Sequence, residues 1–327
     1  MPNALLTEIS REYPGAWGMA EGFRSERAAG LRRWPAWCYL PSPGWAAIAG
    51  VLLDKRPTTM DASEIALLPV LAALGAWRWT QGIYRFHPEL LAELVKTKLT
   101  GDIPADVLLR LPEWCVYIEA GLEFFGLPIK GFFAFHDYES GGARLGMLML
   151  VGDKGVPMPV LPIPLGEGPL EDVIRKSFDR YAGQANAPEY LSLPDAAKAG
   201  AEVLYPFISI LLYLCADEPE IAGHVPGEHP AYPKPVKTKK GLKLFPPDKP
   251  RVWHVGYPTG EKLQRARETA ASATQGEQSA RRAHIRRAHW HGYWTGPKKP
   301  KEGLPPEKQE RRFSYRWLHP MIISGSG

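Results

Sequence analysis

The chain has 327 residues, of which 45% are hydrophobic and 23% are charged. This composition is typical of a globular protein with a sizeable core, and it excludes disordered and fibrous classes. The three cysteines, Cys38, Cys115 and Cys215, lie far apart, which argues against a disulfide framework and for a reducing compartment. The longest apolar run, Val203–Ala216, contains Pro206 and is shorter than the roughly 20 residues of a membrane span. We therefore expect a soluble, cytoplasmic protein with no membrane partner.

Charge is distributed unevenly along the chain. The net charge is +5, yet from Gly223 onward there are 21 Lys and Arg against 8 Asp and Glu, whereas the first 222 residues hold 19 against 27. A basic C-terminal third of this kind predicts phosphate-bearing or acidic partners. The alternative is a solvated basic segment that keeps the protein soluble.

Residues 1–50 are rich in Trp, Gly and Pro, whereas residues 62–99 have a helical pattern. A basic amphipathic helix is expected over Arg24–Arg33, followed by a short strand at Trp34–Leu40 that prolines end. Apolar residues then recur at helical spacing between 62 and 99. Pro88 suits the first position of a second helix within this stretch.

The middle of the chain predicts a sheet. Leu111–Glu119 opens it, residues 129–151 predict an antiparallel hairpin rich in aromatic residues, and Val160–Leu165 carries the prolines of an edge strand. Side chains of a strand alternate between its two faces. Alternation along the first strand therefore gives two opposite pairs, Val116 with Ile118 and Cys115 with Tyr117.

The remaining sequence predicts two helices, a connector and a basic end. Residues 170–181 and 195–215 have helical apolar periods, and prolines alternate with basic residues between 219 and 258. We expect an α+β fold in which mixed helices surround an antiparallel, aromatic-rich sheet. Three parts are predicted. They are an α+β core with a peptide-recognition role at 1–222, a Pro-rich basic connector at 223–260, and a basic C-terminal segment at 261–327 whose strands pack back on the core.

The segment His284–Trp294 has the densest set of chemically active side chains. It holds three of the nine histidines, two arginines and three large aromatic residues. As a strand it would place His289 and His291 on one face with Arg287. Adjacent arginines would repel a metal dication, and no carboxylate or cysteine completes a ligand shell, so we expect no metal site and no cofactor.

Two functional interpretations of this segment stand beside a structural one. The first is a metal-independent ribonuclease in which His289 and His291 act as acid and base while Arg287 stabilises phosphate charge. The second is an RNA or anion surface that neutralises phosphates and stacks on bases. Its predicted residues are Arg286, Arg287, His289, Trp290, His291, Tyr293, Trp294 and Arg316. The structural alternative buries the two tryptophans of this segment in the core.

A second set of aromatic residues, upstream, predicts a peptide-binding groove. Aromatic side chains and arginine are the residue types that dominate the binding energy of protein interfaces. The candidates are Trp77, Arg78, Tyr84, Trp114, Tyr117, Phe133 and Phe135. For each residue taken singly, helix or strand core is the alternative.

Four segments, in this order, resemble one known family. They are Gly75–Tyr84, Leu111–Tyr117, Leu212–Ile221 and His284–Trp294. Together they are similar to the family of the second type V-A anti-CRISPR protein, a large inhibitor, with the resemblance spanning about residues 65–325. The last segment is the most specific of the four, and the first 60 residues match weakly.

The resemblance implies an interaction protein rather than an enzyme. Members of that family are thought to recognise the N-terminal segment of a type V-A CRISPR effector while it is translated, and to cause loss of its mRNA. The implied partners are this N-terminal segment and, through it, a ribosome–nascent chain complex and its mRNA. The runner-up function is RNA binding or ribonuclease activity through the His/Arg cluster at 284–291.

Overall fold

The structure is a computed structural model, and it describes most of the 327 residues. The described ranges are 1–99, 103–166, 168–181, 196–239, 241–273, 284–286, 288–297, 312–318 and 320–323. Its helices are α1 (Pro2–Glu12), α2 (Ala16–Ala28), α3 (Ser42–Leu52), η1 (Pro57–Thr59), α4 (Ala62–Trp77), α5 (Pro88–Lys96), η2 (Ala105–Arg110), α6 (Leu170–Tyr181), α7 (Ala196–Cys215) and α8 (Tyr257–Ala273).

The strands fall into one large sheet and three two-stranded antiparallel sheets. The large sheet contains β1 (Gly82–Phe86), β2 (Cys115–Glu119), β3 (Leu122–Phe124), β4 (Leu127–Glu139), β5 (Gly142–Val151), β6 (Val156–Pro164), β7 (Ile221–Ala222) and β10 (Arg251–Val255). The pairs are β8 (Val236–Thr238) with β9 (Gly241–Lys243), β11 (His284–Arg286) with β14 (Met321–Ile323), and β12 (His289–Thr295) with β13 (Arg312–Leu318).

The large sheet has the order β6-β5-β4-β2-β1-β10-β7, with β3 paired to β4. The predicted α+β class is confirmed. The sheet is mixed rather than wholly antiparallel, because β1 runs parallel to both β2 and β10. Parallel neighbours need long crossover connections, which local sequence patterns do not reveal. Strand β10 comes from the predicted connector, and the predicted boundaries at 222 and 260 remain predictions.

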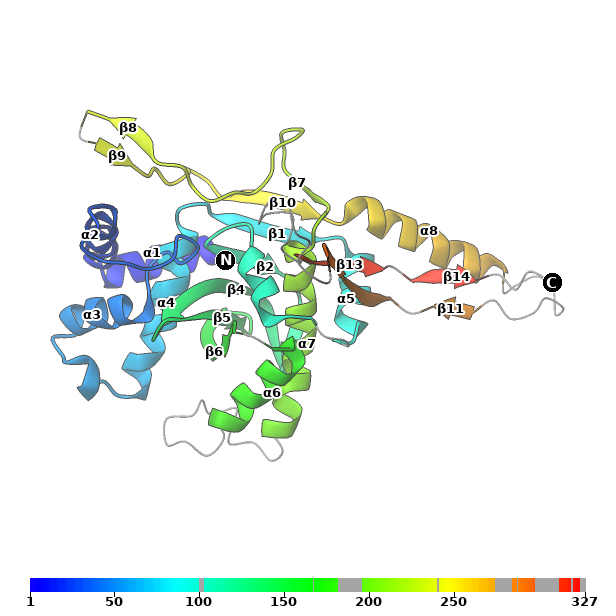
Figure 1. Ribbon diagram of the computed structural model, residues 1–327, viewed down its shortest axis with the longest axis horizontal. Helices are drawn as coiled ribbons and strands as arrows, with labels where there is room; N and C mark the ends of the chain where they lie inside the picture. The colour runs from blue at the N-terminus through cyan, green and yellow to red at the C-terminus, as the bar shows by residue number, and fades with distance from the viewer. Residues whose placement is uncertain are drawn as a thin grey trace.

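Helices cover both faces of the sheet (Figure 1). Tyr117 and Phe133 point into a core shared with α1–α4, whereas Ile118 and Phe132 point into a core shared with α5–α7. The predicted facing of Val116 with Ile118, opposite Cys115 with Tyr117, is therefore confirmed. Because both faces are buried, these strands are apolar at nearly every position.

Local sequence explains where several elements begin and end. α4 starts with a capping box in which the Asp61 side chain and Glu64 satisfy each other's backbone N–H groups. The apolar period expected to continue from α4 is broken at Gly82–Phe86, which forms β1 instead of helix. Gly82 is required there because a Cβ atom would overlap the Glu113 carboxylate. In the described part of the chain no helix is long and apolar enough to span a bilayer.

The C-terminal strands pack back on the core, as predicted. Trp290 of β12 and Tyr315 of β13 are buried against α7. The Trp290 indole N–H donates to the Ser209 hydroxyl at 3.3 Å, and the Tyr315 hydroxyl donates to the Leu212 carbonyl at 2.9 Å. These contacts join the hairpin to the longest helix of the fold.

Asp137, near the end of β4, fastens α3 to the sheet. Its carboxylate accepts hydrogen bonds from the Ser42 backbone N–H at 2.8 Å and from the Ser42 hydroxyl at 2.6 Å, and it pairs with Arg144 of β5. The first N–H groups of a helix have no partner inside the helix. The carboxylate therefore caps α3 from another element and orients the N-terminal helices.

Replacing Asp137 with alanine is expected to lower the free energy of unfolding by about 2 kcal/mol, because the capping bonds and the half-buried Arg144 partner are lost together. Urea denaturation measures this change. Asp153→Ala is the matched control, since Asp153 is exposed and pairs with exposed Lys130. The same loss in both variants would show that the cap does not hold α3.

Candidate functional site

The aromatic residues predicted to bind a peptide lie in the interior. Six of the seven candidates are buried: Trp77, Tyr84, Trp114, Tyr117, Phe133 and Phe135. Most of them form the layer between the sheet and α2–α4, and Tyr84 points into the opposite core. A buried ring cannot touch a peptide that binds at the surface of this conformation. Their role in peptide binding stays a prediction, and what the structure gives them is a packing role.

Their contacts explain that packing role. The Trp77 ring packs edge-on against Phe133 with centroids 5.7 Å apart, and its indole N–H donates to the Gly82 carbonyl at 2.8 Å. Tyr117 packs on the same phenylalanine at 4.9 Å. Trp114 donates to the Ala36 carbonyl at 2.9 Å. The set therefore holds α4 and the N-terminal loops on the sheet.

Arg78, the seventh candidate, lies at the junction of α2 and α4. Its guanidinium donates to Glu21 at 2.7 Å and stacks 4.2 Å from the centroid of the Trp79 ring. The side chain is mostly buried, so it bridges two helices more than it faces solvent. Among the peptide candidates it is the only one that reaches the surface.

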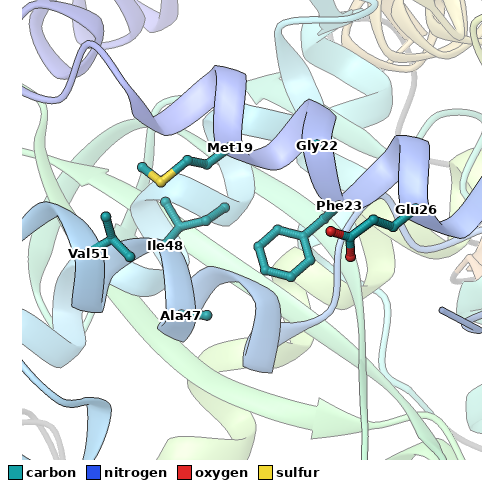
Figure 2. Close-up of a pocket in the computed structure, with 7 residues that line it drawn as sticks. All are labelled: Met19, Gly22, Phe23, Glu26, Ala47, Ile48 and Val51. Atoms are coloured by element: carbon teal, nitrogen blue, oxygen red, sulfur yellow. The ribbon is translucent and has the colours of Figure 1, made fainter. Parts of the chain in front are cut away.

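An apolar depression of about 180 Å³ lies between α2 and α3 (Figure 2). Its lining residues are Met19, Gly22, Phe23, Glu26, Ala47, Ile48 and Val51. The Glu26 carboxylate at its edge already pairs with Arg32, whose guanidinium stacks over Phe23 at 4.6 Å. The depression thus offers apolar contact and no unpaired charge to a ligand.

The β12–β13 hairpin has two distinct faces. Toward the core, the rings of Trp290, Tyr315, Phe313 and Trp294 follow one another with centroid separations of 5.7, 6.2 and 5.1 Å. Gly292 lies in this row because a Cβ atom there would collide with the Phe313 ring. The row runs from the buried Trp290 to Trp294, which is 50% exposed at the far end. The alternation of side chains along the strand therefore gives the hairpin one face of rings toward the core and one polar face opposite it.

The opposite face carries the polar residues of the predicted RNA surface. His291 pairs across the strands with Arg316, and its ring lies 6.0 Å from that of Tyr293. His289 is two residues away on the same face and half-buried. Arg316 reaches Glu218 at 3.4 Å. Of the eight predicted residues, Trp290 belongs to the core, Arg286 is described only as part of β11, and Arg287 lies outside the described residues.

The catalytic hypothesis gains little from this geometry. His291 is exposed on an open two-stranded ribbon, and neither imidazole lines the depression described above. General acid–base catalysis requires both groups within reach of one bound substrate. Within the described ranges, no three His, Cys, Asp or Glu side chains lie close enough together to hold a metal ion. The catalytic role of His289, His291 and Arg287 stays a prediction.

The β8–β9 hairpin is a feature that sequence reasoning did not single out. It projects from the body beyond α2, at the end of the molecule opposite the C-terminal strands (Figure 1). Residues 234–243 contain five lysines and no carboxylate, and Phe245 beside them is 59% exposed. The run of lysines without acidic residues was the available signal, but it lay inside a segment interpreted as proline-rich extended chain.

Glu113 occupies a buried polar cluster at the start of β2. The Thr80 hydroxyl donates to its carboxylate at 3.0 Å. The Tyr84 hydroxyl and the Trp253 indole N–H are buried beside this carboxylate. Burial, only partly offset by these neighbours, raises the pKa of Glu113 to about 8. The cluster is buried, and the raised pKa of Glu113 makes the free energy of unfolding depend on pH.

Comparison with known proteins assigns the class. The family model for AcrVA2-like proteins, the anti-CRISPR type V subtype A2 family, matches residues 84–325. This match spans the chain from within β1 to the last strand, and the chain therefore belongs to that family. The resemblance inferred from the four sequence segments is confirmed.

Individual proteins are also similar to the chain. Protein FinQ of Escherichia coli is 24% identical over 267 residues, covering 76% of this chain and 74% of FinQ. The crystal structure of AcrVA2 matches with a TM-score of 0.66 and 24% sequence identity, covering 98% of each chain. The latter likeness shows a shared fold over the whole length, including the N-terminal helices that the family model does not cover.

Proposed function

We propose that this protein inhibits a type V-A CRISPR effector by recognising the N-terminal segment of the effector as it is translated, and that this recognition lowers the amount of effector mRNA. The observation that carries the proposal is membership of the anti-CRISPR type V subtype A2 family over residues 84–325. The proposed partners are the nascent N-terminal peptide and the ribosome–mRNA complex that presents it.

The structure supports an interaction protein in two respects. Its titratable clusters are enclosed, as at Glu113, or lie on an open ribbon, as at His291. Its basic elements, β8–β9 and the C-terminal strands, project from opposite ends of a packed body (Figure 1). A body of this kind can contact a peptide and a nucleic acid at separate surfaces.

The proposal predicts that the peptide, not the nucleotide sequence, is the signal. A reporter gene is given the effector's N-terminal coding segment in two forms, one recoded with synonymous codons and one shifted out of frame by compensated single-base changes. Co-expression of this protein should lower the mRNA of the recoded reporter, because its peptide is unchanged. The frame-shifted reporter, whose RNA is nearly unchanged, should keep its mRNA.

Direct binding supplies the second measurement. A synthetic peptide of the effector's N-terminal segment should bind the purified protein in a calorimetric titration, and a scrambled peptide of the same composition should not. The opposite reporter pattern, in which the frame-shifted reporter loses its mRNA and the recoded reporter keeps it, would overturn peptide recognition. A folded protein that gives no heat with the authentic peptide would do the same.

A further inference from the structure

We propose that the β8–β9 hairpin is a single-stranded RNA-binding ribbon, in which Lys237, Lys239 and Lys243 neutralise phosphates and Phe245 stacks on a base. The inference rests on the proposed function, because it names the surface through which a protein bound to a nascent chain would hold the accompanying mRNA. It is carried by the charge, the anchoring and the exposed aromatic residue of this one hairpin.

The positive charge of the hairpin is uncompensated. Elsewhere in the C-terminal third the arginines whose side chains are described pair with carboxylates: Arg251 with Glu228, Arg265 with Glu261, Arg267 with Glu89 and Glu93, and Arg316 with Glu218. In the described part of the chain, the exposed Lys237, Lys239 and Lys243 form no ion pair. Among the described residues of this third, these lysines of β8–β9 therefore carry positive charge that no carboxylate offsets.

The hairpin is anchored at both ends rather than tethered loosely. Before β8, the Tyr232 hydroxyl donates to the Leu111 carbonyl at 3.2 Å, and its ring packs edge-on against Trp114 at 5.8 Å. After β9, Leu244 packs on the core that includes α1–α4, and the Gln81 side chain donates to the Pro247 carbonyl at 2.8 Å. Fixed ends reduce the entropy that the lysines would lose on binding.

The placement of the lysines and the exposed ring suit a nucleic-acid strand. Lys237 lies on β8, Lys239 lies in the turn and Lys243 lies on β9, so the paired strands gather the three charges on one short hairpin. Phe245, two residues after the end of β9, is 59% exposed, so most of its ring is open to a ligand. Lysines that follow a phosphate chain beside an aromatic platform are the usual combination in proteins that bind single strands.

Neutralising the lysines tests the inference on the full-length protein. Binding of a fluorescent single-stranded RNA is followed by anisotropy over a series of salt concentrations. The combined variant Lys237→Gln, Lys239→Gln and Lys243→Gln should weaken binding by roughly tenfold or more, and the slope of log affinity against log salt should fall in magnitude by about 2. Phe245→Ala should weaken binding by roughly tenfold and leave that slope unchanged.

The matched control removes the same charge elsewhere. Lys130→Gln, Lys154→Gln and Lys176→Gln alter exposed lysines of the main sheet region and α6, and they should leave both affinity and slope as in the wild type. Equal losses in the two triple variants, or no loss in either, would overturn the inference. So would a hairpin variant that loses binding to phosphatidylglycerol–phosphatidylethanolamine vesicles while keeping its affinity for RNA.

Peptide titration separates this inference from the proposed function. The hairpin variant should bind the effector's N-terminal peptide as the wild type does, because β8–β9 projects away from the packed body (Figure 1). If the wild type fails to bind that peptide, the proposed function falls. The RNA measurements then still decide whether the hairpin binds RNA.

Discussion

Replacing Trp290 with alanine is expected to lower the free energy of unfolding by about 3–5 kcal/mol, the cost typical of removing a buried tryptophan from a packed core. Trp290 is 5% exposed, packs beside Tyr315 and donates to Ser209 of α7. Its removal leaves a cavity between the C-terminal hairpin and that helix. This prediction assumes that β12 holds the C-terminal strands against α7. Urea denaturation measures the change in the free energy of unfolding.

Trp294 provides the matched control on the same strand. It is 50% exposed and contacts Phe313, so Trp294→Ala should cost less than about 1 kcal/mol. Trp290→Phe retains most of the apolar volume and should fall between the two. If Trp290→Ala lowers the free energy of unfolding no more than Trp294→Ala does, the Trp290 ring does not hold the hairpin on α7.

The second large effect concerns the pH dependence of stability. The pKa of Glu113 is about 8 in the folded protein, whereas an unfolded glutamate titrates near its ordinary value. Between these values the folded state holds a proton that the unfolded state has released. The contribution of Glu113 to the free energy of unfolding is therefore fully present at low pH. It is lost as pH rises toward 8, by roughly 3 kcal/mol between pH 5 and 8.

Glu113→Gln removes that titration and keeps an oxygen to accept from Thr80. The variant should gain stability relative to the wild type as pH rises from 5 to 8, by roughly the same 3 kcal/mol. Urea denaturation at several pH values compares the two profiles. Glu123 lies at an exposed position of β3. The stability of Glu123→Gln should therefore depend on pH in the same way as that of the wild type. Parallel profiles for Glu113→Gln would show that this carboxyl is not protonated in the folded state.

Alternation and proline placement made the sheet region predictable. The facing of Val116 and Ile118, the hairpin at 129–151 and the edge strand at 160–165 follow from local rules, and the structure has all three, with the edge strand beginning earlier at Val156. The position of β10 did not follow, because its pairing with β1 joins residues far apart in sequence. The short strand expected at Trp34–Leu40 is absent from the described structure, and those residues form turns and loop.

Residue type alone did not show whether the candidate peptide-binding residues lie at the surface or in the core. Rings such as Trp77 and Phe133 suit an exposed binding surface and a closed core equally well. What decides between them is whether another layer covers the sheet, and α1–α4 do so here. The sequence of the first 60 residues showed helical tendency only in part, so this covering layer could not be anticipated.

The two basic regions were distinguishable only in three dimensions. A count of charges treats the arginines near Glu89, Glu218 and Glu228 as equal to the lysines of β8–β9. The fold brings carboxylates from distant segments to the arginines and leaves the lysines alone. Among the described basic residues, ion pairing therefore separates these arginines from the lysines of β8–β9, which a count of charges does not.

The proline-bearing edge strand also governs how the molecule can associate. β6 has four prolines among its nine residues, Pro157, Pro159, Pro162 and Pro164, and it ends the large sheet on one side. A proline has no N–H, so an incoming strand finds few donors along this border. Extended segments of other chains, including unfolded copies of this protein, cannot lengthen the sheet there. The border acts as a built-in protection against strand-by-strand aggregation, even though the sheet itself is almost entirely apolar.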